Sequence, residues 1–169
     1  PQLLPGIVGY FNRRAVYVRH CIAIRSEHIL ASGLNRAMLF EIAFARGEQL
    51  LDGVENPNWS ECLRIAAERQ RKHFDSAIPD DISDLDKSIA EDVARTMLTM
   101  IRHAESSFAG NVLVKAPMIP GYQWISSGRG DFAIGNALLE VKCTNKHFAA
   151  ADYRQILIYW LLSYAASVE

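Results

Sequence analysis

The chain has 169 residues, half of them hydrophobic and 22% charged. This composition excludes a disordered or collagen-like chain, and the length suffices for a core without disulfide or metal staples. The formal net charge of −1 excludes a protein that binds nucleic acid merely by being basic overall. The charge is unevenly distributed along the chain. Residues 75–92 are strongly acidic, with seven acidic residues and one Lys. Residues 1–74 have ten basic and seven acidic residues, and residues 93–169 have seven basic and five acidic residues. A polyanionic partner would therefore contact only part of the surface.

The three cysteines, Cys21, Cys62 and Cys143, are odd in number and far apart. They exclude a disulfide framework, and no pair has the short spacing of a zinc or iron–sulfur site. We interpret them as reduced thiols of a cytoplasmic protein. No apolar run reaches the roughly 18 residues of a membrane span, so we expect no membrane partner.

Residues 1–80 are predicted to form a mainly helical accessory region. Its expected elements are, in chain order, strands at 7–11 and 15–24 and helices at 26–51 and 57–74. β-Branched and aromatic residues favour the two strands, which a turn at 12–14 would join into a short hairpin. Ser26 is a suitable N-cap for the first helix, and Pro57 suits the first position of the second.

The acidic stretch at 75–86 has the strongest loop character in the chain, so we place a boundary there and expect a second unit over residues 81–169. The elements expected in this unit are a helix at 84–105, strands at 111–116, 122–134 and 137–143, and a helix at 149–167. The middle strand is interrupted at 126–128, and the first helix repeats apolar residues at helical spacing. A helix, three strands and a second helix in this order predict a mixed α/β fold of the α+β class.

Residues 130–142 combine a tight turn with three charged side chains. Gly135 and Asn136 are a two-residue hairpin signal, and a loop of these two residues pairs positions whose numbers sum to 271. Asp131 then lies opposite Glu140 with Cβ atoms about 5 Å apart, where like charges destabilise the pair unless something compensates them. Lys142 lies two residues beyond Glu140 and so points to the same face. The spacing predicts two carboxylates and one amine in one place.

Two carboxylates and a lysine suit phosphodiester hydrolysis. Carboxylate oxygens bind Mg²⁺ or Mn²⁺ and leave water in the other coordination positions. The metal lowers the pKa of a bound water and neutralises charge that grows on the phosphoryl group. The lysine can orient the water, help to deprotonate it or stabilise the transition state. The simpler alternative is a surface ion pair between Lys142 and Glu140 on a half-exposed hairpin.

Asp131, followed nine positions later by Glu140, Val141 and Lys142, resembles the signature of the PD-(D/E)XK nuclease superfamily. The resemblance covers about residues 84–169 and implies a restriction-endonuclease-like αβββα core with a mixed sheet. It implies that Asp131 and Glu140 bind Mg²⁺ or Mn²⁺, with the carbonyl of Val141 as a further ligand. Lys142 would be the catalytic lysine.

A second motif lies in the predicted last helix, where Gln155 and Tyr159 are similar to the Gln-x-x-x-Tyr motif of the RecB-like and lambda-exonuclease-like branches. Their spacing of four places them on one helical face. The resemblance implies that both support the catalytic lysine or contact substrate. Many members also supply a Glu from the first core helix; Glu91 and Glu105 are the candidates here, and we favour Glu91 because it leaves about the usual distance to the first strand.

Basic residues surround the motif. Arg129 precedes Asp131, while Lys146 and Arg154 follow the catalytic strand, where they are placed to neutralise phosphates. The alternative is that these are solvated surface charges. Three large aromatic side chains are expected in the core rather than on a base-stacking surface: Trp124, Trp160 and Tyr164.

The resemblance implies a divalent-metal-dependent nuclease that hydrolyses phosphodiester bonds in nucleic acid, usually DNA, and by analogy serves defence, restriction or mobile elements. The alternative is an inactive subunit that keeps this fold and binds or assembles within a larger nucleic-acid-processing complex. The sequence leaves open whether the N-terminal helices bind DNA or a partner protein or only pack against the nuclease core. It also leaves open whether the chain has protein partners or forms a homo-oligomer. Gly130 stands where the family often has Pro. The family's core also has a strand after its second helix, so either the sequence is truncated after residue 169 or that strand is missing.

Overall fold

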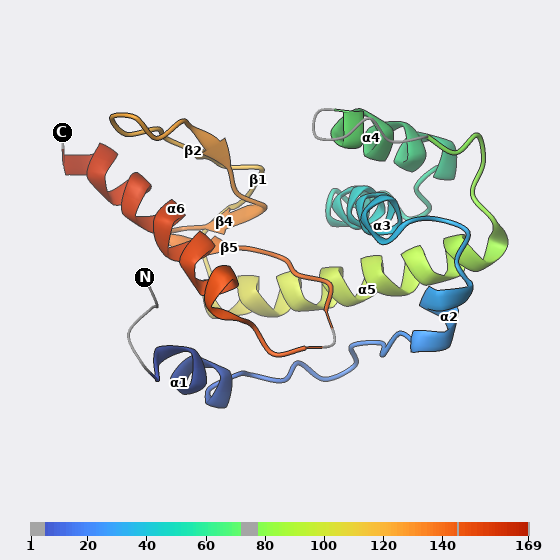
Figure 1. The fold of residues 1–169 in the computed structure, drawn as a ribbon, viewed down its shortest axis with the longest axis horizontal. Helices are drawn as coiled ribbons and strands as arrows, with labels where there is room; N and C mark the ends of the chain where they lie inside the picture. Colours follow the sequence, from blue (N-terminus) through green and yellow to red (C-terminus); the bar gives the residue numbers. More distant parts are fainter. Residues whose placement is uncertain (1–5, 72–77, 145, 169) are drawn as a thin grey trace. The chain divides into compact units, whose positions relative to one another are not determined.

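The computed structural model describes residues 6–71, 78–144 and 146–168 and belongs to the α+β class (Figure 1). The helices are α1 (Ile7–Arg13), α2 (Ser26–Ala31), α3 (Arg36–Leu51), α4 (Trp59–Arg71), α5 (Asp84–Ser107) and α6 (Ala150–Val168). The strands are β1 (Leu113–Lys115), β2 (Met118–Ile119), β3 (Gly128–Arg129), β4 (Phe132–Ile134) and β5 (Ala137–Leu139). The helices predicted at 84–105 and 149–167 are confirmed as α5 and α6. Of the helix predicted at 57–74, residues 59–71 are helical, and 72–74 lie outside the described residues.

The chain divides into two compact units, which we call the helical unit (Val18–His103) and the sheet unit (Pro1–Tyr17 with Ala104–Glu169). This division differs from the boundary predicted near residue 80. Ile82 and Ile89 are buried in the same core as residues of α3, so the end of the acidic stretch belongs to the helical unit. Apolar burial therefore outweighs the loop-like composition that suggested a boundary there.

The helical unit is built on α3 and α4, which pack against each other, with the first part of α5 joining their core. Arg46 of α3 is also buried, and it has several partners. It donates a hydrogen bond to the carbonyl of Pro57 at 2.6 Å, pairs with Glu91, and lies 4.0 Å from the ring centroid of Trp59. A buried guanidinium needs such partners, because leaving its charge unpaired would be costly.

The single helix predicted at 26–51 is instead interrupted between α2 and α3. Asn35 caps α3, since its side-chain oxygen accepts a hydrogen bond from the amide of Met38 at 2.8 Å. Ser32 ends α2, and its hydroxyl donates to the carboxylate of Asp86 at 2.6 Å. Short polar side chains bond more favourably at a helix end than inside a helix, which explains the break.

The hairpin predicted over 7–24 is wrong: residues 7–13 form α1, and 15–18 and 21–25 are irregular. Tertiary contacts with α6 accompany the helical form. The ring of Phe11 stacks on Tyr153 with centroids 5.5 Å apart. Asn12 donates to the carbonyl of Phe148 and accepts from the hydroxyl of Tyr153, both at 2.9 Å. β-Branched composition is a weak signal that such packing overrides.

The sheet unit contains a three-stranded antiparallel sheet in the order β1-β4-β5. The predicted register is confirmed: Ile134 pairs with Ala137 and Phe132 with Leu139, so the numbers sum to 271. Gly135 has a φ of +57°, and a Cβ there would lie 2.7 Å from Asn111 Oδ1, so the turn favours glycine.

The resemblance implied a mixed sheet, but every strand pair in the described part of the chain is antiparallel. The two-residue loop between β4 and β5 permits only an antiparallel pair, because a parallel pair would need a crossover of a dozen or more residues. The longer connection between β1 and β4 contains the β2–β3 ladder instead of a crossover helix. The predicted strand at 122–134 is also broken up. Tyr122 and Ile125 form only an isolated bridge, while β3 pairs with β2 at residues that we expected to be a break between strands.

Candidate functional site

The β4–β5 hairpin positions the two predicted acids. Phe132 and Ile134 are fully buried, so alternation along the strand directs Asp131 to the opposite face. Asp131 precedes β4 and Glu140 follows β5, directly beyond the pair Phe132–Leu139. The carboxylate of Asp131 accepts a hydrogen bond from the backbone amide of Val141 at 2.7 Å, which ties it to the chain that leaves β5.

Glu140, Lys142 and Gln155 are joined by three hydrogen bonds. Lys142 Nζ donates to Glu140 Oε1 at 3.0 Å and to Gln155 Oε1 at 2.9 Å. Gln155 Nε2 donates to the same oxygen, Glu140 Oε1, at 2.7 Å. The structure therefore brings one residue of α6 to two residues that follow β5. The simple ion pair that the sequence offered as an alternative is present, but Gln155 makes it a three-membered network.

Partial burial strengthens this network. The side chains of Lys142 and Glu140 are 30% and 14% exposed, so water screens their attraction less than it would on an open surface. An ammonium group has three N–H bonds, of which the network uses two. The third can donate to another oxygen. Gln155 thus fixes the orientation of the Lys142 ammonium group and adds no charge of its own.

The same residues suit a hard divalent cation. Asp131, Glu140 and the carbonyl of Val141 offer oxygen ligands of the kind that Mg²⁺ and Mn²⁺ prefer. Both bonds to Glu140 reach Oε1, and within the described part of the chain no hydrogen bond is found to its Oε2. No cluster of three His, Cys, Asp or Glu side chains occurs in residues 6–71, 78–144 and 146–168. A cation held by Asp131, Glu140 and Val141 would therefore have two carboxylates and a backbone carbonyl as protein ligands, with water to complete its coordination.

Tyr159 lies one helical turn beyond Gln155 on α6 and is half-buried. The three predicted phosphate-binding residues are exposed. Arg129 is in β3 and donates to the carbonyl of Ala116 at 3.3 Å. Lys146 and Arg154 lie on either side of the start of α6. Their contact with nucleic acid remains a prediction.

Glu91, the favoured helix acid, belongs to the helical unit, where its carboxylate pairs with Arg46 and Arg95. Glu105, the other candidate, is half-buried and belongs to the sheet unit with the hairpin. Two arginines already neutralise Glu91, so we leave it out of the site that we propose below. A role for Glu105 stays a prediction.

Sequence reasoning missed the contacts that hold α1 on α6. Asn12 and Tyr153 carry no recognisable pattern, and only the three-dimensional packing identifies them. The aromatic residues expected in the core are instead exposed, with Trp124, Trp160 and Tyr164 at 87%, 51% and 55%. That expectation was wrong because aromatic composition shows that a side chain can be buried, not that a partner surface is present.

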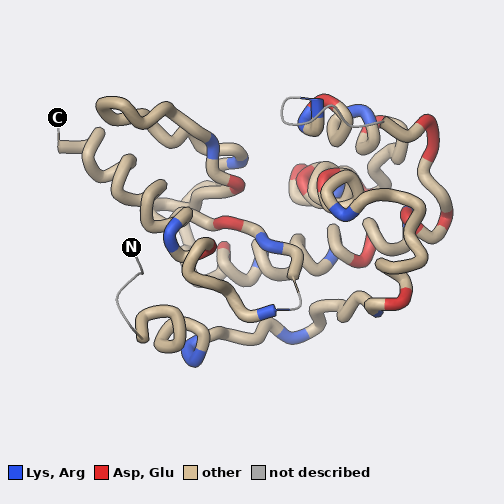
Figure 2. The backbone as a smooth tube through the Cα atoms, in the orientation of Figure 1, with Lys and Arg blue, Asp and Glu red and all other residues tan. Residues whose placement is uncertain are grey.

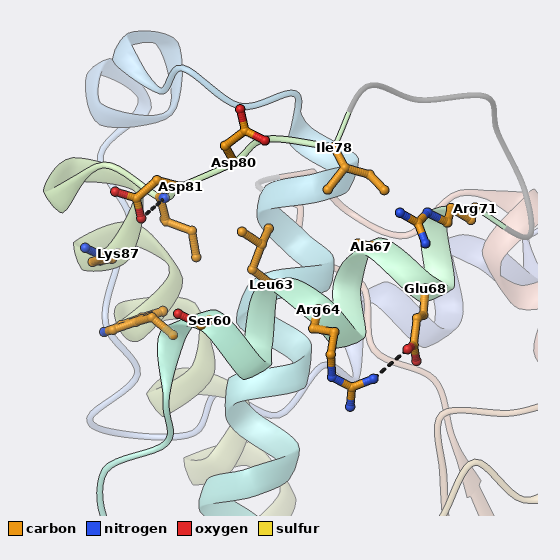
Figure 3. Close-up of a pocket in the computed structure, with 12 residues that line it drawn as sticks. Ser60, Leu63, Arg64, Ala67, Glu68, Arg71, Ile78, Asp80, Asp81 and Lys87 are labelled. Carbon is orange, nitrogen blue, oxygen red and sulfur yellow. Dashed lines mark hydrogen bonds and ion pairs between the residues drawn. The ribbon is translucent and has the colours of Figure 1, made fainter.

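The helical unit contains a cavity of about 430 Å³ between α4, the start of α5 and the segment before α5 (Figure 3). Its walls carry charges of both signs, and Figure 3 shows Arg64 paired with Glu68 and the side chain of Asp81 bonded to a backbone amide. The guanidinium of Arg64 also bonds to Glu61 at the surface and thereby lowers the pKa of the Glu61 carboxyl. Mixed and mutually paired charges select no ligand class, so we assign no site there.

Comparison with family models, curated proteins and solved structures finds no match for this chain. No helix in the described part of the chain is long and apolar enough to cross a membrane. The fold and site thus define an α+β protein with a carboxylate–lysine–glutamine network beside a β-hairpin.

Proposed function

We propose that this protein is a divalent-metal-dependent nuclease of the PD-(D/E)XK type and that its substrate is DNA. One observation carries the proposal: Lys142 is held between Glu140 and Gln155, at 3.0 and 2.9 Å, beside the amide that binds Asp131. A salt bridge alone would not require an uncharged hydrogen-bonding partner from a separate helix.

The order of elements supports the same proposal. α5, the three strands β1, β4 and β5, and α6 follow one another as in an αβββα core. The motif residues sit at the matching places: Asp131 before β4, Glu140 and Lys142 after β5, and Gln155 in the second turn of α6. The additional β2–β3 ladder lies within the connection between β1 and β4.

In this proposal Asp131, Glu140 and the carbonyl of Val141 hold the metal, and Lys142 acts on the reacting phosphate. A bound Mg²⁺ or Mn²⁺ supplies Lewis acidity and lowers the pKa of its water. Lys142 directs its remaining N–H toward the attacking water or a phosphoryl oxygen, where negative charge grows in the transition state. Gln155 is a positioning residue, because it acts through Lys142 and Glu140.

Cleavage assays test the proposal. Linear, circular and single-stranded DNA and an RNA of the same sequence are incubated with the protein and Mg²⁺, Mn²⁺ or EDTA. We expect DNA cleavage with metal and none with EDTA, and a loss of at least about a hundredfold in Lys142→Met, the scale on which removal of one transition-state donor acts. Lys87→Met is the matched control, because Lys87 is a surface lysine of α5 paired only with its neighbour Asp84 among the described ion pairs.

Cleavage that is equally fast in Lys142→Met and Lys87→Met would contradict the proposal. DNA binding without cleavage under all metal conditions would instead favour the alternative, an inactive subunit of this fold that binds or assembles within a larger complex. Faster cleavage of the RNA than of the DNA would keep the mechanism and correct the substrate.

A further inference from the structure

α6 has an unusual distribution of apolar residues for a helix at the edge of a unit. Its inner side packs against β2 and β5 and carries Gln155, Tyr159 and Leu162, of which only Leu162 is buried. Beyond Arg154 the described part of the helix has no charged residue, as Figure 2 shows by its uniformly tan colour. A helix that is apolar all round is normally covered on all sides.

The uncovered apolar residues form one stripe. Leu157, Leu161, Tyr164 and Val168 follow a spacing of four, three and four, which places them on one side of a helix. Two further residues flank the stripe: Ile158 and Trp160. All six are between 40% and 65% exposed. We call these six residues the outer stripe of α6.

Two aromatic residues of the outer stripe pack against each other. The rings of Trp160 and Tyr164 stack with centroids 5.6 Å apart and an interplanar angle of 8°. Among the described contacts, those of α1 reach the start of α6 and the segment before it, where Phe11 and Asn12 contact Tyr153 and Phe148. The outer stripe begins after these contacts and extends to the end of the described helix.

The area of the outer stripe is that of an interface. Trp160 and Tyr164 are aromatic side chains of about 150–250 Å² each, and the other four side chains are smaller and aliphatic. With about half of each residue exposed, the six present roughly 600 Å². This lies at the upper end of the largest apolar patch found on a typical monomer. Two such patches bury about 1,200 Å² in total, which is the lower bound for a specific and stable interface.

We propose that two copies of this chain pair through the outer stripes of their α6 helices, in an antiparallel arrangement about a two-fold axis near Leu161. A two-fold axis brings the same surface of each copy together, so any charge on it would meet its own counterpart. The stripe carries none, and therefore pairs with itself without like-charge repulsion.

Arg154 and the helix dipoles select the antiparallel direction. In a parallel pair the two copies of Arg154 would lie side by side. With Leu161 at the axis of an antiparallel pair they are about 21 Å apart, at 1.5 Å of rise per residue, which is beyond the screening length of about 8 Å at physiological salt. Antiparallel helices also place each N-terminus near the partner's C-terminus, where the dipoles attract.

Pairing of this kind leaves the candidate site accessible. Gln155 is two residues from both Tyr153 and Leu157, which is 160° the shorter way round a helical wheel of 100° per residue, so it faces away from the stripe. The dimer does not depend on the proposed nuclease activity, and either can fail without the other.

The oligomeric state tests the proposal directly. Sedimentation equilibrium of the full chain from 1 to 100 μM should show a mass near twice 18.9 kDa. In Leu161→Glu the mass should fall to that of the monomer, since two carboxylates would meet at the axis. Met100→Glu is the matched control and should stay dimeric, because Met100 is also a half-exposed apolar residue of a helix, α5.

A mixing experiment guards against misfolding of the variants. Leu161→Glu and Leu161→Arg should each be monomeric alone and should form a mixed dimer when combined, because opposite charges then meet across the axis. A wild-type chain that is monomeric at 100 μM would overturn the proposal, as would a mixture that stays monomeric. Binding of the monomer to lipid vesicles of phosphatidylcholine, lost in Leu161→Glu, would assign the stripe to a membrane surface and also overturn it.

Discussion

Removal of the Gln155 amide is the perturbation whose effect on catalysis can be worked out most fully. Gln155→Leu keeps the approximate volume but deletes two hydrogen bonds, at 2.9 Å from Lys142 and 2.7 Å to Glu140. Hydrogen bonds to charged groups contribute about 1.5–3 kcal/mol each when water is excluded. Because both partners keep their mutual ion pair and are partly exposed, we expect about 2 kcal/mol in total.

If Lys142 acts in the transition state, this loss should appear in kcat as a decrease of roughly thirtyfold. The assay is single-turnover cleavage of a labelled DNA duplex, with DNA affinity measured separately by fluorescence anisotropy. A merely structural Gln155 would lower the melting temperature and the affinity instead. A positioning residue lowers kcat and leaves the DNA affinity nearly unchanged, even though loss of the two hydrogen bonds also lowers the melting temperature.

Ser163→Ala is the control on the same helix. Its hydroxyl is exposed and donates only to the carbonyl of Tyr159 among the described contacts, so the change should leave kcat within about twofold. The reasoning is refuted if Gln155→Leu and Ser163→Ala have the same kcat, or if Gln155→Leu loses DNA affinity in proportion to kcat.

Three further predictions concern the fold. Gly135→Ala should lower the free energy of unfolding by about 1–3 kcal/mol, because φ is +57° and the new Cβ would meet Asn111. Urea denaturation measures this change, and an unchanged midpoint would contradict the prediction. Arg46→Met should lower the free energy of unfolding by about 3 kcal/mol, because it leaves the half-buried carboxylate of Glu91 with one partner fewer. In a double-mutant cycle, Glu91→Gln should recover part of this loss, and full additivity of the two changes would argue against the pairing. Burial raises the pKa of the Cys62 thiol, so this thiol ionises at lower pH in the unfolded chain than in the folded one. The free energy of unfolding should therefore fall as the pH rises above the ordinary thiol pKa. The urea midpoints at pH 8 and pH 10 should differ less in Cys62→Ala than in the wild type, and an equal difference would refute the assignment.

The sequence predicted the hairpin correctly because its register depends on a local signal. Gly135 supplies the positive φ of a two-residue loop, and that loop fixes every pair from Ile134–Ala137 to Phe132–Leu139. The place of Asp131 and Glu140 follows from this register alone. α5 and α6 were also predictable, because both are long and free of internal glycine and proline.

Two of the failures involve contacts between distant parts of the chain. Nothing near Asn12 in the sequence indicates that Tyr153 will bind it, and those contacts accompany a helix where a strand was expected. The exposure of Trp160 likewise depends on what lies beside α6, not on its own sequence. The bonds from Gln155 to Lys142 and Glu140 form a middle case: helical spacing predicted the face, and only the structure gave the partners.

The central claim is that Asp131, Glu140 and Lys142 form a metal-dependent phosphodiesterase site. The most direct measurement is a time course of plasmid DNA cleavage in Mg²⁺ by the wild-type chain and by Asp131→Asn at equal concentration. We predict cleavage by the wild type and at least a hundredfold slower cleavage by Asp131→Asn, because the amide removes a charged metal ligand. Equal cleavage by both proteins would contradict the account.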